Sequence, residues 1–220
     1  MTFTTASTAP KAGNFRENRL LQALVAGYLV VWIVLALSPI DRQDWLLENL
    51  LAVTWVLVLT TTYRRFPFSD LSYVLITLFM MLHAIGAHYT YTKVPFGFWL
   101  KDIFELSRNH FDRIVHFAFG LLLAYPAYEL VVRAANARKG WAAVLAMLTA
   151  ISMSGLFEVL ESWVAQIVSP ELGAAYLGTQ GDEWDAQKDM TMAISGVLIA
   201  MGLIYFIPRV APHRAEIARN

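Results

Sequence analysis

Residues 178–189 read Gly-Thr-Gln-Gly-Asp-Glu-Trp-Asp-Ala-Gln-Lys-Asp, and this polar stretch leads directly into an apolar run from Met190 to Ile207. A helix needs about 17–25 predominantly apolar residues to cross the hydrocarbon core of a bilayer. The run satisfies that length. The sequence therefore predicts a membrane-spanning helix that the chain enters through an acidic segment.

The three aspartates of this segment are spaced as helix neighbours. A helix that begins near Gly181 places Asp182, Asp185 and Asp189 on one face, because they recur at i, i+3 and i+7. Acidic side chains in a first turn ordinarily cap free N–H groups and complement the helix dipole. Capping uses one or two carboxylates, and two carboxylates four residues apart repel by roughly 0.2–0.5 kcal/mol. The third carboxylate therefore predicts a partner, which is a cation, a proton or a hydrogen-bond donor.

The composition places the whole chain in a membrane. Its 220 residues are 57% hydrophobic and 15% charged, with a mean hydropathy of +0.50, which is high for a water-soluble domain. The sequence predicts an all-α bundle of six spanning helices, and the apolar runs lie at Leu20 to Leu37, Trp45 to Thr62, Leu71 to His88, Ile114 to Val132, Trp141 to Val168 and Met190 to Ile207. Polar tails are expected at 1–19 and 208–220.

The charges exclude some partners and predict an orientation. The formal net charge is zero, which gives no electrostatic basis for binding nucleic acid. Eleven of the seventeen Lys and Arg residues lie on the side of the termini, so the positive-inside rule predicts that both termini are cytoplasmic. No cysteine is present, so any metal site must use nitrogen and oxygen ligands.

A shorter amphipathic segment precedes the fourth span. Between Val94 and Asn109, apolar side chains recur at three- to four-residue spacing, with charged residues on the other side. This pattern predicts an interfacial helix on the extracytoplasmic side. It could be a lid over a site or a connector packed on lipid headgroups, and we expect the connector.

Ionisable residues gather at the extracytoplasmic ends of the later spans. Asp112 and His116 are four residues apart and share a helix face, either as an acid that orients an imidazole or as two metal ligands. Gly120, one turn deeper, could let another helix approach closely. His83 and His88 lie at the end of the third span, where a packing role and a functional role are both open.

The fifth span carries two acids, Glu158 and Glu161. A charged carboxylate at the centre of a span costs about 2.5–3.5 kcal/mol on insertion scales, so such residues usually face the bundle interior and are paired or protonated. Glu158 lies about ten residues from the end of its run, roughly 15 Å along a helix. Glu161 is shallower and could snorkel to the interface. The first two spans carry almost nothing ionisable and are expected to be scaffold.

Three strings in the chain, Gly86 to Tyr91, Asp112 to Phe117 and Leu177 to Gln187, together resemble the YjdF-like family of bacterial inner-membrane proteins. The resemblance covers about Leu20 to Ile207 and implies a multi-spanning protein of the bacterial inner membrane with no assigned reaction. A looser similarity exists to VanZ-like membrane proteins, although Arg113 stands where that pattern has Lys.

These residues predict one cavity that opens to the extracytoplasmic face. The candidate metal ligands are His88, Asp112, His116, Glu158, Glu161, Asp182, Asp185 and Asp189, with Glu158 and Asp185 as candidate catalytic residues. Histidine ligation suits Zn²⁺, Mn²⁺ or Fe²⁺, and carboxylates alone suit Mg²⁺ or Ca²⁺. Three classes of function remain open: a metal-dependent enzyme acting on a lipid or lipid-linked substrate, a proton- or ion-coupled transporter, and an accessory membrane protein with a structural polar core.

Overall fold

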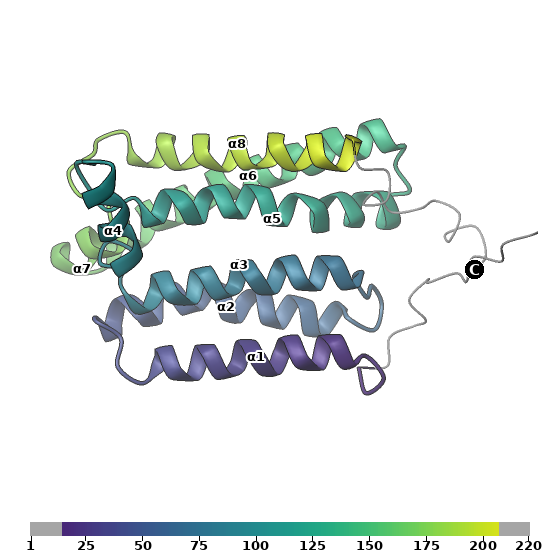
Figure 1. Cartoon of the computed structure of the whole chain (residues 1–220), viewed down its shortest axis with the longest axis horizontal. Helices are drawn as coiled ribbons and strands as arrows, with labels where there is room; N and C mark the ends of the chain where they lie inside the picture. The colour runs from purple at the N-terminus through teal and green to yellow at the C-terminus, as the bar shows by residue number, and fades with distance from the viewer. Residues whose placement is uncertain (1–14, 207–220) are drawn as a thin grey trace, which may run out of the picture.

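The computed structural model describes residues 15–206, which form eight helices and no strand (Figure 1). Six of these helices are long and apolar enough to cross a membrane, which confirms the predicted fold class. The spanning helices are α1 (Arg19–Ala36), α2 (Arg42–Thr62), α3 (Asp70–His88), α5 (Phe111–Ala134), α6 (Lys139–Ile167) and α8 (Asp185–Phe206). Ile207 and most of the two expected tails lie outside the described residues.

Two short helices lie at the end of the bundle opposite the start of α1 and the end of α8 (Figure 1). The first, α4 (Pro95–Ile103), is the helix expected between Val94 and Asn109, and it begins with proline at its first position. The second, α7 (Pro170–Leu177), was not predicted. Ser169 caps it by accepting a hydrogen bond from the Leu172 amide at 3.3 Å.

The centre of the bundle is α5, which packs against α3, α6 and α8. Its contact with α8 is backbone to backbone at two glycines. A Cβ atom on Gly120 would lie 2.0 Å from the Ala193 carbonyl oxygen, and one on Gly196 would lie 2.2 Å from the Phe117 carbonyl oxygen. Only glycine permits this approach, as in other small-residue helix pairs in membranes. The close approach predicted at Gly120 is confirmed.

Near the C-terminal end of α5, Glu129 links that helix to the start of α3. Its carboxylate accepts hydrogen bonds from the Ser69 amide at 2.9 Å, the Ser69 hydroxyl at 2.7 Å and the Ser72 hydroxyl at 2.5 Å, and it pairs with Arg133. Every interaction is made by the protein itself, so we assign Glu129 a structural role.

The glycine contact predicts a difference between two substitutions on one helix. Gly196→Ala should lower the free energy of unfolding by roughly 1–3 kcal/mol, because the added methyl group overpacks against α5. Gly202→Ala is the control, because a Cβ there meets nothing within 4 Å, and alanine should stabilise the helix by up to about 1 kcal/mol. Thermal unfolding in detergent measures both. Equal midpoints would contradict the role of the glycine contact.

Candidate functional site

The acidic segment before α8 is held by two arginines from the segment that leads into α5 and its first turn. Arg113 donates to a carboxylate oxygen of Asp182 at 2.5 Å, and Arg108 makes a close ion pair with Asp185. Arg108 also donates to the main-chain carbonyls of Gly178 and Thr179, at 3.1 and 2.7 Å. The sequence predicted a partner for these aspartates. For Asp182 and Asp185 that partner is a guanidinium group from the same chain.

The expectation that all three aspartates share a helix face is wrong for Asp182. The helix begins at Asp185 rather than near Gly181, because Gly178, Gln180 and Gly181 all have positive φ, which a right-handed helix cannot contain. Asp182 sits in the preceding turn, where its carboxylate accepts from the Trp184 amide at 3.1 Å.

Donors on three sides explain the charge state of Asp182. Its carboxylate accepts hydrogen bonds from Lys188, from the Trp184 amide and from Arg113. Together they lower the pKa of Asp182 from its ordinary value to about 2. Asp182 is thus charged at neutral pH and already satisfied, so it is poorly suited to act as a metal ligand.

A second pair of contacts fastens the same two loops. The main-chain N–H of Asn109 donates to the Gln180 side-chain oxygen at 3.2 Å. The Gln180 side-chain NH₂ donates back to the main-chain carbonyl of Asn109 at 2.9 Å. The Asn109 side chain reaches the Val94 carbonyl at 3.0 Å, and a Cβ on Gly97 would collide with it. These bonds fix α4 and the entrances to α5 and α8 relative to one another.

One turn deeper, α5 and α8 bring together three groups able to hold a metal ion. The ligating atoms of Asp112, His116 and Asp189 all lie within 4.8 Å of one another. His116 and Asp189 are buried, and one oxygen of Asp189 has no hydrogen-bond partner among the described residues; its nearest cation is Arg113, whose Nε lies 3.9 Å away.

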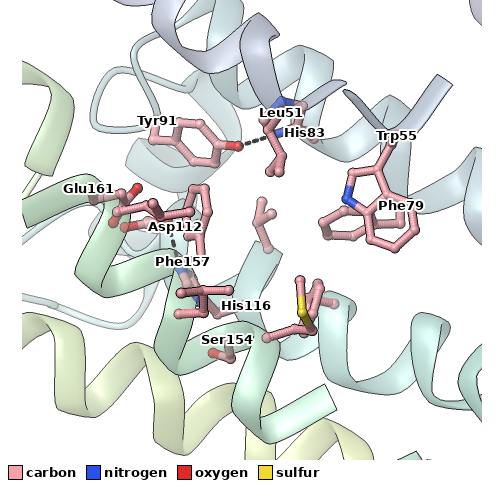
Figure 2. A pocket seen from close by; sticks show the side chains of 15 residues that line it. Leu51, Trp55, Phe79, His83, Tyr91, Asp112, His116, Ser154, Phe157 and Glu161 are labelled. Carbon is pink, nitrogen blue, oxygen red and sulfur yellow. Dashed lines mark hydrogen bonds and ion pairs between the residues drawn. The ribbon is translucent and has the colours of Figure 1, made fainter. Parts of the chain in front are cut away.

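Glu158 on α6 completes this group from the other side of His116. Its Oε1 atom lies 3.4 Å from His116 Nε2. The same nitrogen is 3.6 Å from an oxygen of Asp112 (Figure 2). The same Oε1 atom is buried and makes no hydrogen bond with the described residues. One nitrogen of His116 is therefore close to carboxylates of both α5 and α6, and the carboxylate of Asp189 on α8 lies near the same imidazole.

Tyr91 and Tyr176, which lie outside the spanning helices, are buried near further acids. Burial, followed by the negative charges of Glu48, Asp112 and Glu161, raises the pKa of Tyr91 well above its ordinary value. Burial, Glu48, Glu161 and Asp44 raise the pKa of Tyr176 in the same way.

Asp44 and Glu48 on α2 were missed by the sequence analysis, which treated the first two spans as scaffold. Both are almost completely buried, and both oxygens of Asp44 and one oxygen of Glu48 lack hydrogen-bond partners in the described part of the chain. A signal was present, because the two acids are four residues apart and share a face. The span was predicted to begin at Trp45, which left Asp44 outside it.

The two histidines of α3 have separate environments. His88 Nδ1 lies 2.7 Å from the Leu35 carbonyl at the end of α1, so the structure does not bring His88 into the group around His116. His83 has its Nε2 atom 3.1 Å from the Glu48 carbonyl and its Nδ1 atom 2.5 Å from the Tyr91 hydroxyl. Because a carbonyl only accepts, Nε2 carries the proton and Nδ1 accepts from Tyr91.

A cavity of about 80 Å³ adjoins the group (Figure 2). Side chains from α2, α3, α5 and α6, together with Tyr91, line it. Its polar lining consists of His83, Tyr91, Asp112, His116, Ser154 and Glu161. The space suffices for several water molecules, and among the grouped residues Asp112 and His116 border it.

Comparisons with known proteins place the chain in a family. Residues 20–209 match the family described as "Predicted membrane protein (DUF2238)". The chain is 37% identical over 170 residues to the inner membrane protein YjdF of Escherichia coli, and these residues make up 77% of this chain and 81% of that protein. No solved structure matches. With six helices of membrane-spanning length and this match over most of its residues, the chain belongs to the DUF2238 family of multi-pass membrane proteins.

Proposed function

We propose that Asp112, His116 and Asp189 bind one divalent metal ion. The supporting observation is that their ligating atoms lie within 4.8 Å of one another. Nitrogen and oxygen ligands that share a metal at about 2.0–2.2 Å lie within about 4.4 Å of each other, so small side-chain movements would complete the site. One imidazole with two carboxylates suits Zn²⁺, Mn²⁺ or Fe²⁺.

The unpartnered carboxylate oxygens support a cation at this position. A buried carboxylate oxygen without a hydrogen bond is unfavourable, and Asp189 and Glu158 each have one such oxygen among the described residues. Arg113 Nε lies 3.9 Å from the first and His116 Nε2 lies 3.4 Å from the second, so each has a possible counter-ion nearby but no hydrogen bond. Arg108 and Arg113 are directed mainly at Asp182 and Asp185. A cation beside His116 would neutralise the acids that these arginines leave unpaired.

The chemistry that follows is hydrolysis or another metal-assisted reaction of a lipid or lipid-linked substrate. A divalent ion supplies Lewis acidity and lowers the pKa of a water molecule. Glu158, whose carboxylate lies 3.4 Å from His116, is placed to accept a proton as a general base. Asp185, which we predicted to be catalytic, is instead paired with Arg108, and we assign it to positioning the start of α8.

A proton-coupled carrier is the competing proposal. In that case the buried acids hold protons rather than a metal, and protonated carboxyls satisfy one another by hydrogen bonding. Metal content separates the two proposals directly.

The first prediction concerns metal content. Protein purified in detergent should retain about one transition metal ion per chain, and His116→Ala and Asp189→Asn should lose it, because each removes a ligand. His88→Ala is the matched control, since that imidazole contacts the Leu35 carbonyl. Elemental analysis of the four proteins measures this. A native protein without metal after reconstitution with Zn²⁺, Mn²⁺ or Fe²⁺ would exclude the metal site.

The second prediction concerns Glu158. Glu158→Gln keeps the side-chain shape and removes the charge next to His116, so metal affinity should fall by about 10–100-fold, the usual effect of losing a partner of a ligand. Glu171→Gln is the control, because Glu171 is an exposed acid at the same end of the bundle. A competition assay with a chelator reports the affinity. Unchanged affinity in the Glu158 variant would remove that residue from the site.

We also infer that the site faces the extracytoplasmic side of the inner membrane. The basic residues concentrate near the termini, whereas α4, α7 and the acidic segment lie at the opposite end of the bundle (Figure 1).

Single cysteines in this cysteine-free chain test the orientation. Glu183 and Ala135 are exposed at opposite ends of the bundle. In intact cells an impermeant thiol reagent should label Glu183→Cys and leave Ala135→Cys unlabelled until the cells are opened. Labelling of the Ala135 variant alone would reverse the orientation.

A further inference from the structure

The cavity next to His116 is polar at one end and apolar along the rest of its length. Its apolar lining includes Leu51 and Trp55 of α2, Phe79 of α3, and Leu156 and Leu160 of α6. Figure 2 shows Phe79 beside Trp55, away from Glu161 and Asp112. Leu156 and Leu160 are also exposed on the outer surface of the bundle. In a bilayer that surface meets lipid, so the cavity is bordered by side chains that face the hydrocarbon region.

The helices leave this side of the cavity without a covering element. In the described part of the chain, α2 packs on α3 and α7, and α6 packs on α5, α7 and α8, whereas α2 and α6 are not a closely packed pair. The short helix α7 is the element that contacts both. Side chains of both α2 and α6 line the cavity, so the cavity lies between these two helices at a place where they do not pack closely on one another.

The polar end of the cavity lies nearer the membrane surface than its apolar part, as the head of a lipid lies nearer that surface than its hydrocarbon chains. Asp112 is the second residue of α5, and Glu161 lies six residues before the end of α6, so both are near the surface of the membrane. Met153, which also lines the cavity, lies eight residues deeper than Glu161, about 12 Å along the helix. A lipid with its head near Glu161 and a chain along Met153 would match this gradient.

The polar end also indicates the charge of the head group. None of the lining residues is lysine or arginine. The lining does include two acids, Asp112 and Glu161, together with the phenol of Tyr91. An ammonium group is attracted to the face of an aromatic ring and to a carboxylate of opposite charge, and this end of the cavity offers both kinds of group.

We propose that a membrane lipid enters this cavity sideways between α2 and α6, with a hydrocarbon chain along Leu156 and an ammonium-bearing head beside Glu161 and Tyr91. As an assignment of substrate class, the inference rests on the proposed function. As an assignment of a binding site it does not require the metal, and the two can fail separately.

The test uses the purified protein in liposomes of phosphatidylethanolamine that contain a small fraction of a phosphatidylethanolamine analogue with a photoreactive diazirine near the end of one chain. After illumination, mass spectrometry locates the labelled residues. Labelling is expected to concentrate on cavity residues such as Met153 and Phe157. It should fall when the analogue is replaced by a phosphatidylglycerol of the same chain, which has no ammonium group.

Two tryptophan variants of α6 serve as a matched pair. Leu156 lines the cavity and Leu148 does not, yet their exposed fractions are similar, 47% and 50%. Leu156→Trp should reduce labelling of the cavity about tenfold, because a loss of about 1.4 kcal/mol in binding has that effect. Leu148→Trp should leave it unchanged. Thermal unfolding of both variants shows whether they are folded.

Labelling spread evenly over the lipid-facing residues of the bundle, or equal cavity labelling by the two head groups, would overturn the inference. If Leu156→Trp does not fold, the comparison of head groups in the native protein still decides. Metal content is measured on the same samples. Cavity labelling in a metal-free native protein would remove the proposed function and keep this inference, whereas a metal-loaded protein without cavity labelling would do the reverse.

Discussion

The direct contact between the backbones of α5 and α8 is the constraint on which the site depends. Gly120 lies against the Ala193 carbonyl, and Gly196 lies against the Phe117 carbonyl. His116 is one turn from Gly120, and Asp189 is one turn from Ala193, both toward the same end of the bundle. The separation of the two helices thereby sets the distance between imidazole and carboxylate. Side chains as short as aspartate can meet across two helices only when the helices are this close.

The second constraint is the cost of placing acids in hydrocarbon. At the boundary of the bundle, Arg108 and Arg113 offset this desolvation cost for Asp185 and Asp182, because a guanidinium group can form several hydrogen bonds at once. Deeper in the bundle, Asp189 and Glu158 have no equivalent partner. Asp182 and Asp185, which arginines satisfy, therefore differ from Asp189 and Glu158, each of which keeps a buried oxygen without a hydrogen bond in the described part of the chain.

Much of the fold follows from the sequence, since spanning helices are recognised from long apolar runs whose backbone must satisfy itself in lipid. The six spans and the interfacial α4 were predicted within a few residues. So was the sharing of one end of the bundle by Asp112, His116, Glu158 and Asp189. The short α7 escaped prediction because eight residues carry too little periodicity to distinguish a helix from a loop.

Side-chain partners were less predictable, because sequence spacing does not show which helix lies opposite. His88 lies at the expected end of the bundle, but its imidazole contacts the Leu35 carbonyl of α1. Asp44 and Glu48 are buried, although they belong to a helix that was predicted to be scaffold. Asp182 left the helix face because three residues with positive φ delayed the start of α8. Whether the clustered acids bind a metal is a question of protonation and ligation that spacing alone does not answer.

The attachment of α7 has a mechanical consequence. A Cβ on Gly173 would lie 2.6 Å from the Ala165 carbonyl, so α7 is pressed onto the end of α6 and must move with it, while its other contacts are with α2. Those two spans are thus braced at the membrane surface and unbraced below. Any change in the separation of α2 and α6 is therefore restrained most at that surface, where α7 contacts both helices.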